Sequence, residues 1–320
     1  MQLSTSIIYK LHECIRITRI YKKYPLEELF PINRNVNRGI TIDVDVGNNP
    51  IKFFFFGCWN DKIEKTEQII KSLDMSFQFG LINGDNFYPT KTEKDGVKEK
   101  TYDMGRVERG FKILRIFPNN IYMSLGNHEV DNPTICSTLI TEIEHTHKTN
   151  LMIPSNYYGL NVSNMKGDKM TVIILDVNLL ETNLCYDDVS REIHKIKMLD
   201  WFRSKIEYIK TATEISTYVV MGHYPLFFVN KKGVFKVNET TIEILEILRG
   251  LSKPVYYLAS DVHNFQHIIH RNIHQFIVGT GGAKLDDLIE TVQTATQKAP
   301  IEFPVDGEKY TIIQANRTDI

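Results

Sequence analysis

The feature that most constrains this chain is a series of short apolar runs, each followed directly by a turn rich in glycine and polar side chains. Residues 51–56 are the clearest case, an apolar run that ends at Gly57, as in a strand buried on both faces. Stretches with helical spacing alternate with these runs, which predicts an α/β fold. Because the carboxyl ends of strands gather at one edge of an α/β sheet, we expect the turns to converge there.

Five such turns come from distant parts of the chain. We expect strands over residues 51–56, 77–82, 121–125, 217–221 and 255–259, and helices over residues 62–73, 106–117, 195–209 and 240–249. A further strand is expected over residues 170–176 and a hairpin over residues 267–278. The turns after the five strands are Gly57-Cys58-Trp59, Gly84-Asp85-Asn86-Phe87-Tyr88, Gly126-Asn127-His128-Glu129, Gly222-His223-Tyr224-Pro225 and Asp261-Val262-His263-Asn264.

The side chains in these turns suit phosphate-ester hydrolysis at a pair of metal ions. That reaction needs a hydroxide nucleophile and positive charge around the phosphoryl oxygens, and two metals supply both. Asp85 is a natural bridging carboxylate, and Tyr88 in the same turn can present a phenolate. Asn127 offers an amide oxygen, and His223 and His263 offer imidazole nitrogens.

With all five motifs in order between about residue 51 and about residue 282, the chain resembles the small purple acid phosphatases, a branch of the calcineurin-like metallophosphoesterases. The resemblance implies an α/β fold, a four-layer αββα sandwich of two mixed β-sheets flanked by helices. It implies a first metal held by Cys58, Asp85, Tyr88 and His263, and a second held by Asp85, Asn127, His223 and Asp261. It further implies that His128 lies over the phosphate as a catalytic acid and that Glu129 orients it.

Two positions depart from the family pattern, which has Asp at position 58 and His at position 261. Cys58 replaces a hard oxygen with sulfur: a thiolate would favour zinc, and a buried protonated thiol would merely pack. Asp261 remains a competent ligand and favours harder ions. We therefore expect one or two metal ions per chain, from zinc, iron or manganese.

Two functions fit these residues. The first is a metallophosphatase that hydrolyses phosphomonoesters, with activity affected by Cys58 and Asp261. The alternative is a catalytically inactive pseudo-phosphatase that serves as a binding or structural protein, since a fold does not fix function. The segments around 91–101 and 178–190 are expected to contact the phosphate-ester substrate.

Composition bounds the remaining expectations. We expect the 320 residues to divide into an N-terminal extension, residues 1–50, and a metallophosphoesterase domain, residues 51–320. In the extension we expect a helix over residues 7–21 and a role in docking a protein partner. A net charge of −1 gives no indication of nucleic acid or membrane binding. With no signal peptide or transmembrane segment apparent, we expect the four cysteines to be free thiols in the cytoplasm.

Overall fold

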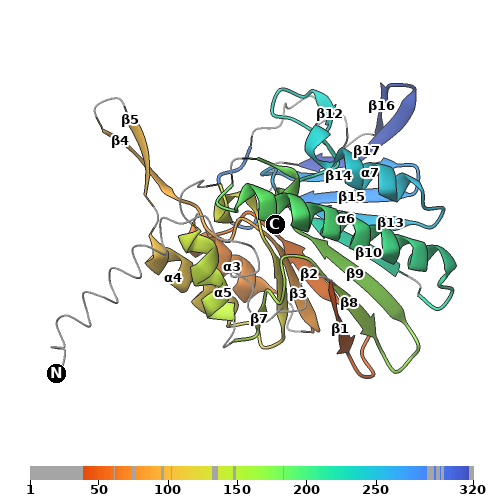
Figure 1. The fold of residues 1–320 in the computed structure, drawn as a ribbon, viewed down its shortest axis with the longest axis horizontal. Coiled ribbons are helices and arrows are strands. Elements are labelled where there is room, and N and C mark those ends of the chain that lie inside the picture. Colours follow the sequence, from red (N-terminus) through yellow and green to blue (C-terminus); the bar gives the residue numbers. More distant parts are fainter. Residues whose placement is uncertain are drawn as a thin grey trace.

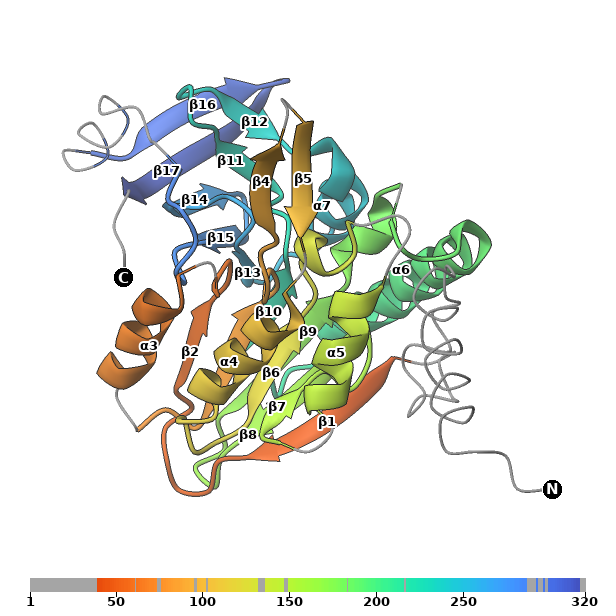
Figure 2. The ribbon, with the colours of Figure 1, turned by 90° about the vertical axis from the view of Figure 1, so that its left-hand side faces the viewer.

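Two β-sheets lie back to back between two layers of helices (Figures 1 and 2). The computed structural model describes residues 39–316 except 61, 74–75, 95–96, 102, 132–135, 147–148, 183, 216, 287–291, 293–295 and 297–298. Helices α3, α4 and α5 cover the smaller sheet, and α6 and α7 cover the larger one. The four-layer sandwich expected from the sequence is therefore confirmed.

The larger sheet has nine strands in the order β1-β8-β9-β10-β13-β15-β14-β17-β16 and mixes parallel and antiparallel pairs. Its strands in chain order are β1 (Ile40–Asp45), β8 (Tyr158–Ser163), β9 (Lys169–Leu175), β10 (Thr217–Gly222), β13 (Val255–Ala259), β14 (Phe265–His270), β15 (Ile273–Val278), β16 (Ile301–Val305) and β17 (Glu308–Asn316).

The smaller sheet, in the order β2-β3-β6-β7, is parallel throughout and thus not mixed as the resemblance implies. Its strands are β2 (Phe53–Phe56), β3 (Phe79–Asn83), β6 (Ile121–Ser124) and β7 (Leu151–Met152). The helices are α3 (Ile63–Ser72), α4 (Met104–Leu114), α5 (Ser137–Thr146), α6 (Asp188–Thr211) and α7 (Ile242–Arg249), with 3-10 turns η2 (Asn127–Glu129), η3 (Val177–Leu180) and η4 (Glu239–Thr241). Two short antiparallel pairs, β4 (Thr90–Lys94) with β5 (Val97–Thr101) and β11 (Phe227–Val229) with β12 (Phe235–Val237), complete the described elements.

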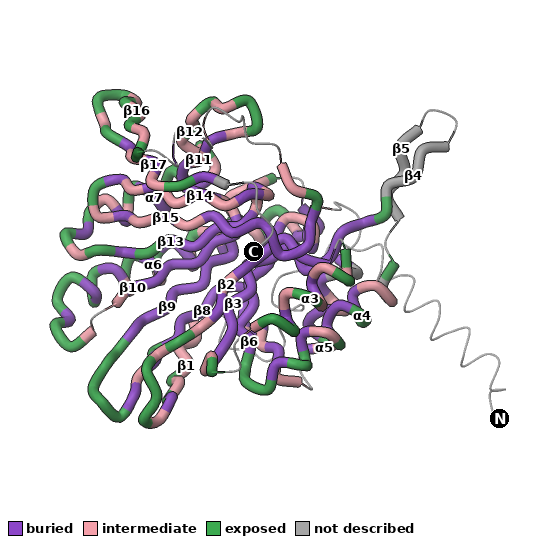
Figure 3. The backbone as a smooth tube through the Cα atoms, turned by 180° about the vertical axis from the view of Figure 1, so that it is seen from behind, coloured by how far each residue is buried: buried purple, intermediate pink, exposed green. Residues whose placement is uncertain are grey.

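The buried strands form where the apolar runs predict them. Figure 3 shows burial concentrated in the strands between the helical layers, where β3 and β6 are buried at every position. A strand covered on both faces has no polar side, which explains its continuous apolar sequence. Helix α6 begins seven residues before the expected range at 195, because Asp187 caps it by accepting a hydrogen bond from the Ser190 N–H (2.9 Å).

The larger sheet includes part of the expected N-terminal extension. Strand β1 pairs in parallel with β8 at the edge of this sheet, from Ile40 opposite Tyr158 to Asp45 opposite Ser163. Residues 40–45 are thus part of the sandwich, although they precede the expected domain boundary at residue 51. The helix expected over residues 7–21 lies outside the described residues.

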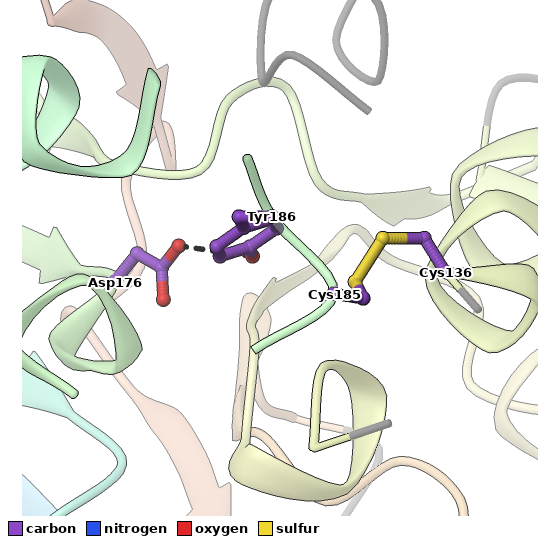
Figure 4. Close-up of a disulfide and its surroundings, with 4 residues drawn as sticks. All are labelled: Cys136, Asp176, Cys185 and Tyr186. Atoms are coloured by element: carbon purple, nitrogen blue, oxygen red, sulfur yellow. Dashed lines mark hydrogen bonds between the residues drawn. A yellow bond between two sulfur atoms is a disulfide. The ribbon is translucent and has the colours of Figure 1, made fainter. Parts of the chain in front are cut away.

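The expectation that all four cysteines are free thiols is wrong for two of them. Cys136 and Cys185 form a disulfide that joins the residue before α5 to the segment before α6 (Figure 4). The fold brings these segments together, since Cys185 donates its backbone N–H to the carbonyl of Val130 (2.9 Å). Disulfides persist mainly in oxidising compartments, so the bridge counts against the expected cytoplasmic location. Cys58 is a buried free thiol.

The segment at 91–101, expected to contact substrate, lies almost entirely in the β4–β5 hairpin, which projects from the sandwich in Figure 1. The other expected substrate segment, 178–190, spans most of η3 and the start of α6. Among the described helices, none combines the length and the apolar character needed to cross a lipid bilayer.

Candidate metal centre

The five predicted turns meet at one rim of the sandwich, where β2, β3, β6, β10 and β13 end. Asn83, the last residue of β3, ties the two sheets together there by donating to the carbonyls of Gly222 (3.0 Å) and Leu258 (3.2 Å). The next residue, Gly84, has a φ of +71°, and a Cβ at this position would overlap the backbone of Gly126. The glycine in the second turn is therefore required for the second and third turns to touch.

Asp85 is the centre of the site. Its carboxylate is buried and accepts hydrogen bonds from the Tyr88 hydroxyl at Oδ2 (2.9 Å) and from the backbone N–H of His128 at Oδ1 (3.1 Å). The same Oδ1 lies 3.3 Å from Nε2 of His223. Burial opposes ionisation, but His223 and His128 outweigh it and hold the pKa of Asp85 below its usual value. Asp85 thus presents a charged oxygen to each half of the site, as the bridging role requires.

The two predicted histidine ligands share one arrangement. His223 places Nδ1 2.8 Å from the carbonyl of Asn83, and His263 places Nδ1 2.8 Å from the carbonyl of Lys284. A carbonyl can only accept, so each Nδ1 carries a proton and Nε2 is the ring nitrogen left to face the site. Both Nε2 atoms face the site. This fixing of the tautomer by an outer hydrogen bond is typical of metal-ligating histidines.

The second predicted ligand set surrounds Nε2 of His223 with oxygen atoms. Oδ1 of Asn127 is at 3.2 Å and Oδ1 of Asp261 at 3.8 Å, in addition to Oδ1 of Asp85. Burial lowers the pKa of His223, but the Asp85 carboxylate outweighs this effect and raises the pKa to about 9. Only a cation, either a proton or a metal ion, can stabilise a nitrogen lone pair and three oxygens directed at the same point. The donor set of one imidazole, one amide and two carboxylates fits a divalent metal.

The first predicted set contains Cys58, one of the two residues that depart from the family pattern. Nε2 of His263 lies 3.1 Å from the Tyr88 hydroxyl, which contacts Asp85 in turn. Cys58 lies 3.7 Å from Oδ2 of Asp85, but its thiol donates to the backbone carbonyl of Ser260 (2.9 Å). Burial, together with the Asp85 carboxylate, raises the pKa of the Cys58 thiol. Sγ of Cys58 therefore reaches the site as a protonated thiol.

These distances identify one compact cluster within the described part of the chain. The ligand atoms of Cys58, Asp85 and His223 all lie within 4.8 Å of one another, and all three residues are buried. Such a cluster can hold a metal ion. The structure brings all nine predicted site residues to this rim.

Glu129 has a different position from the one the resemblance implies. Its carboxylate accepts hydrogen bonds from the backbone N–H groups of Asp85 (3.0 Å), Asn86 (2.8 Å) and Gly126. It therefore holds the turn that carries Asp85. The acid next to the His128 ring is Asp131, whose Oδ2 is 3.3 Å from Nδ1.

Two buried acids behind the site were not singled out from the sequence. Glu142 of α5 accepts a hydrogen bond from the side chain of Asn86 (3.2 Å), and burial raises its pKa to about 8. Asp176, at the end of β9, accepts from the Tyr186 hydroxyl (3.3 Å), and burial raises its pKa to about 7. Nothing in the local sequence separates them from exposed acids, because their burial depends on distant segments.

No protein-family model matches the chain, and no curated protein matches it either. Similar solved structures include a dimetal phosphatase from Danio rerio (11% identity, 72% of this chain, 87% of that chain, TM-score 0.49). They also include GAP50, the anchor in the inner membrane complex of Plasmodium (14% identity, 74% and 75%, TM-score 0.48), and PhoD (12% identity, 73% and 58%, TM-score 0.46). This chain thus spans less than two thirds of PhoD. Because these similarities are distant, we infer function from the geometry of the site.

Proposed function

We propose that this protein is a metal-dependent phosphatase of the purple acid phosphatase type, which hydrolyses phosphomonoesters. The observation that carries the proposal is the shared orientation of His223 and His263. Each has Nδ1 2.8 Å from a backbone carbonyl and Nε2 turned toward the surroundings of Asp85. A core histidine needs only hydrogen-bond partners, whereas two rings that both direct Nε2 toward one buried carboxylate match the needs of a metal pair.

Bound metal ions would supply a hydroxide nucleophile and positive charge for the phosphoryl oxygens. The chain's own residues would do the rest. The ring of His128 packs at a tilt against the ring of Tyr88, with centroids 4.7 Å apart, and its Nδ1 faces Asp131. That arrangement leaves Nε2 of His128 to donate a proton to the leaving-group oxygen. Glu129 would keep Asp85 in place by holding its backbone N–H.

The two metal sets are unequal. The second set, with Asp85, Asn127, His223 and Asp261, has four donor atoms of types that divalent ions bind readily. The first set depends on whether a metal ion can displace the proton of the Cys58 thiol. We therefore propose that the second set fills first and that zinc is the ion best suited to complete the first.

A catalytically inactive pseudo-phosphatase is the second candidate, and one contact favours it. The Cys58 thiol donates to the Ser260 carbonyl at 2.9 Å, a bond that a thiolate could not make. If this bond persists in the presence of metal, the first set lacks a ligand and the site can bind one ion without a second to activate the nucleophile.

The test combines metal analysis with turnover of p-nitrophenyl phosphate under added Zn²⁺, Mn²⁺, Mg²⁺ or iron. We expect bound metal and turnover in the wild-type protein, and loss of both in His223→Asn. His274→Asn, which changes a partly buried histidine of β15 away from the rim, is the matched control and should behave as wild type. Metal without turnover would support the pseudo-phosphatase, and absence of both metal and turnover under every condition would exclude the metal-dependent phosphatase.

A further inference from the structure

Helix α6 has an apolar stripe on its outer surface. Val189, Ile193 and Ile196 are 69%, 43% and 53% exposed, and their i, i+4, i+7 spacing places them on one face. The opposite face carries the core residues Met198 and Phe202. Single exposed apolar residues are ordinary, but three in register on a helix that already buries its other face indicate a contact surface.

Other elements of the fold lie along both sides of this apolar stripe. On one side α7 lies against α6, with Glu243 3.8 Å from Lys195 and 3.9 Å from Arg203. On the other side β1 is joined to α6 by a hydrogen bond from Lys205 to the Thr41 hydroxyl (2.9 Å). Between them, nothing in the described ranges of the chain buries the three apolar side chains. The stripe is thus a bounded surface, one helix wide.

The N-terminal chain enters the fold beside this surface. A Cβ on Gly39 would overlap the indole of Trp201, so the backbone at Gly39 lies directly against α6. Ile193 lies eight residues before Trp201, which is about 12 Å along the helix. Thirty-eight residues precede Gly39, and an extended chain spans about 3.3 Å per residue, so a short part of them suffices to reach the stripe.

The direction of the chain also fits. Strand β8 is antiparallel to β9, and β1 is parallel to β8. Helix α6 connects the parallel strands β9 and β10 and therefore runs opposite to them, in the direction of β1. Residues that continue β1 backwards from Gly39 consequently lead toward the first half of α6, where the stripe lies.

The N-terminal sequence contains apolar residues at helical spacing that could cover the stripe on α6. Ile7, Leu11 and Ile15 recur at the i, i+4, i+8 spacing of an amphipathic helix, and Cys14 falls on the same face, three residues after Leu11. We propose that residues 7–20 of the same chain form a helix that docks on Val189, Ile193 and Ile196. Each apolar face then leaves water by covering the other.

A cross-linking experiment on the full chain tests this directly. Cys58 is buried and Cys136 and Cys185 are bonded to each other, so Cys14 is the natural thiol available for labelling. In Ile193→Cys, a short bismaleimide should join Cys14 to position 193 within one chain, at monomer mass. Met165→Cys, at a site 70% exposed in the β8–β9 turn, is the matched control and should give no such link.

Hydrogen exchange on full-length Ile193→Glu provides an independent measurement. Exchange in residues 7–20 should accelerate by about tenfold or more relative to wild type, and Met165→Glu should leave it unchanged. Cross-links only between two chains would assign the stripe to self-association and overturn the proposal. Absence of any Cys14 link, or unchanged exchange in residues 7–20, would overturn it as well.

Discussion

Replacing Cys58 with Asp changes the ligand chemistry of the proposed first metal set. Cys58 is buried, 3.7 Å from Oδ2 of Asp85, and has a φ of +52°. Asp is among the residues that tolerate this left-handed conformation, so the backbone can accept Cys58→Asp. The substitution trades a neutral thiol for a carboxylate facing another carboxylate.

The magnitude follows from that separation. Two unit charges about 4 Å apart interact with about 4 kcal/mol at an effective dielectric constant of about 20. Without metal, we expect Cys58→Asp to lower the free energy of unfolding by about 2–4 kcal/mol. The loss lies toward the lower value if one of the two carboxyls binds a proton, because the proton removes the charge repulsion. A metal ion between the carboxylates reverses the sign of this effect, and occupancy at about a hundred times Kd stabilises the fold by about 2.7 kcal/mol.

Chemical denaturation in EDTA and in excess Mn²⁺ or Zn²⁺ measures both quantities. Cys58→Asp should be less stable than wild type in EDTA and should gain more stability from metal than wild type gains. Cys58→Ala removes the thiol without adding charge, so its gain from metal should not exceed that of wild type. Equal stability of Cys58→Asp and wild type in EDTA, or equal gains from metal in all three proteins, would refute the placement of position 58 in a metal set.

Three further predictions concern residues around the site. Asp131→Asn should lower kcat by roughly tenfold or more with alkyl phosphates and less with p-nitrophenyl phosphate, because a good leaving group depends less on proton donation by His128; equal losses with both substrates would contradict the role of Asp131. Burial raises the pKa of Asp176 from 3.8 to about 7, so the folded state binds the proton more tightly and this group's contribution to stability is lost as pH rises from about 4 to about 7. Asp176→Asn should remove that part of the pH dependence in denaturation curves, at most about 4 kcal/mol; an unchanged pH profile would contradict it. Replacing both Cys136 and Cys185 with Ser should lower the free energy of unfolding by about 2–4 kcal/mol, and an unchanged denaturation midpoint would show that the bridge does not form.

The strands and the turns that end them were predictable because their signals are local. The apolar run before Gly57 indicated a strand, although β2 lies at a sheet edge, where Phe54 and Phe56 are buried and Phe53 and Phe55 only partly buried. Gly84 is needed where two turns touch, and its place after an apolar run was visible in the sequence. The alternation in β1 at Ile40, Ile42 and Val44 was also present in the sequence. It is the weaker, half-buried signal of an edge strand, and the extension expected over residues 1–50 obscured it.

Other features depend on contacts between distant segments. Cys136 and Cys185 are separated by 49 positions, and the number of cysteines does not reveal which ones pair. The different positions of Glu129 and Asp131 depend on how the η2 turn is oriented, because both acids follow His128 closely in the sequence. The sequence motifs therefore predicted which residues lie at this rim, whereas the contacts of these residues depend on the three-dimensional fold.

We infer that the rim around Asp85 binds metal. Metal content of the full-length protein by mass spectrometry, after loading with Zn²⁺ or Mn²⁺ and removal of free ions, tests it most directly, with Asp85→Asn and His274→Asn measured alongside. We predict at least one equivalent in wild type and in His274→Asn, and loss of that metal in Asp85→Asn. Metal-free wild-type protein, or the same metal content in Asp85→Asn, would contradict the claim.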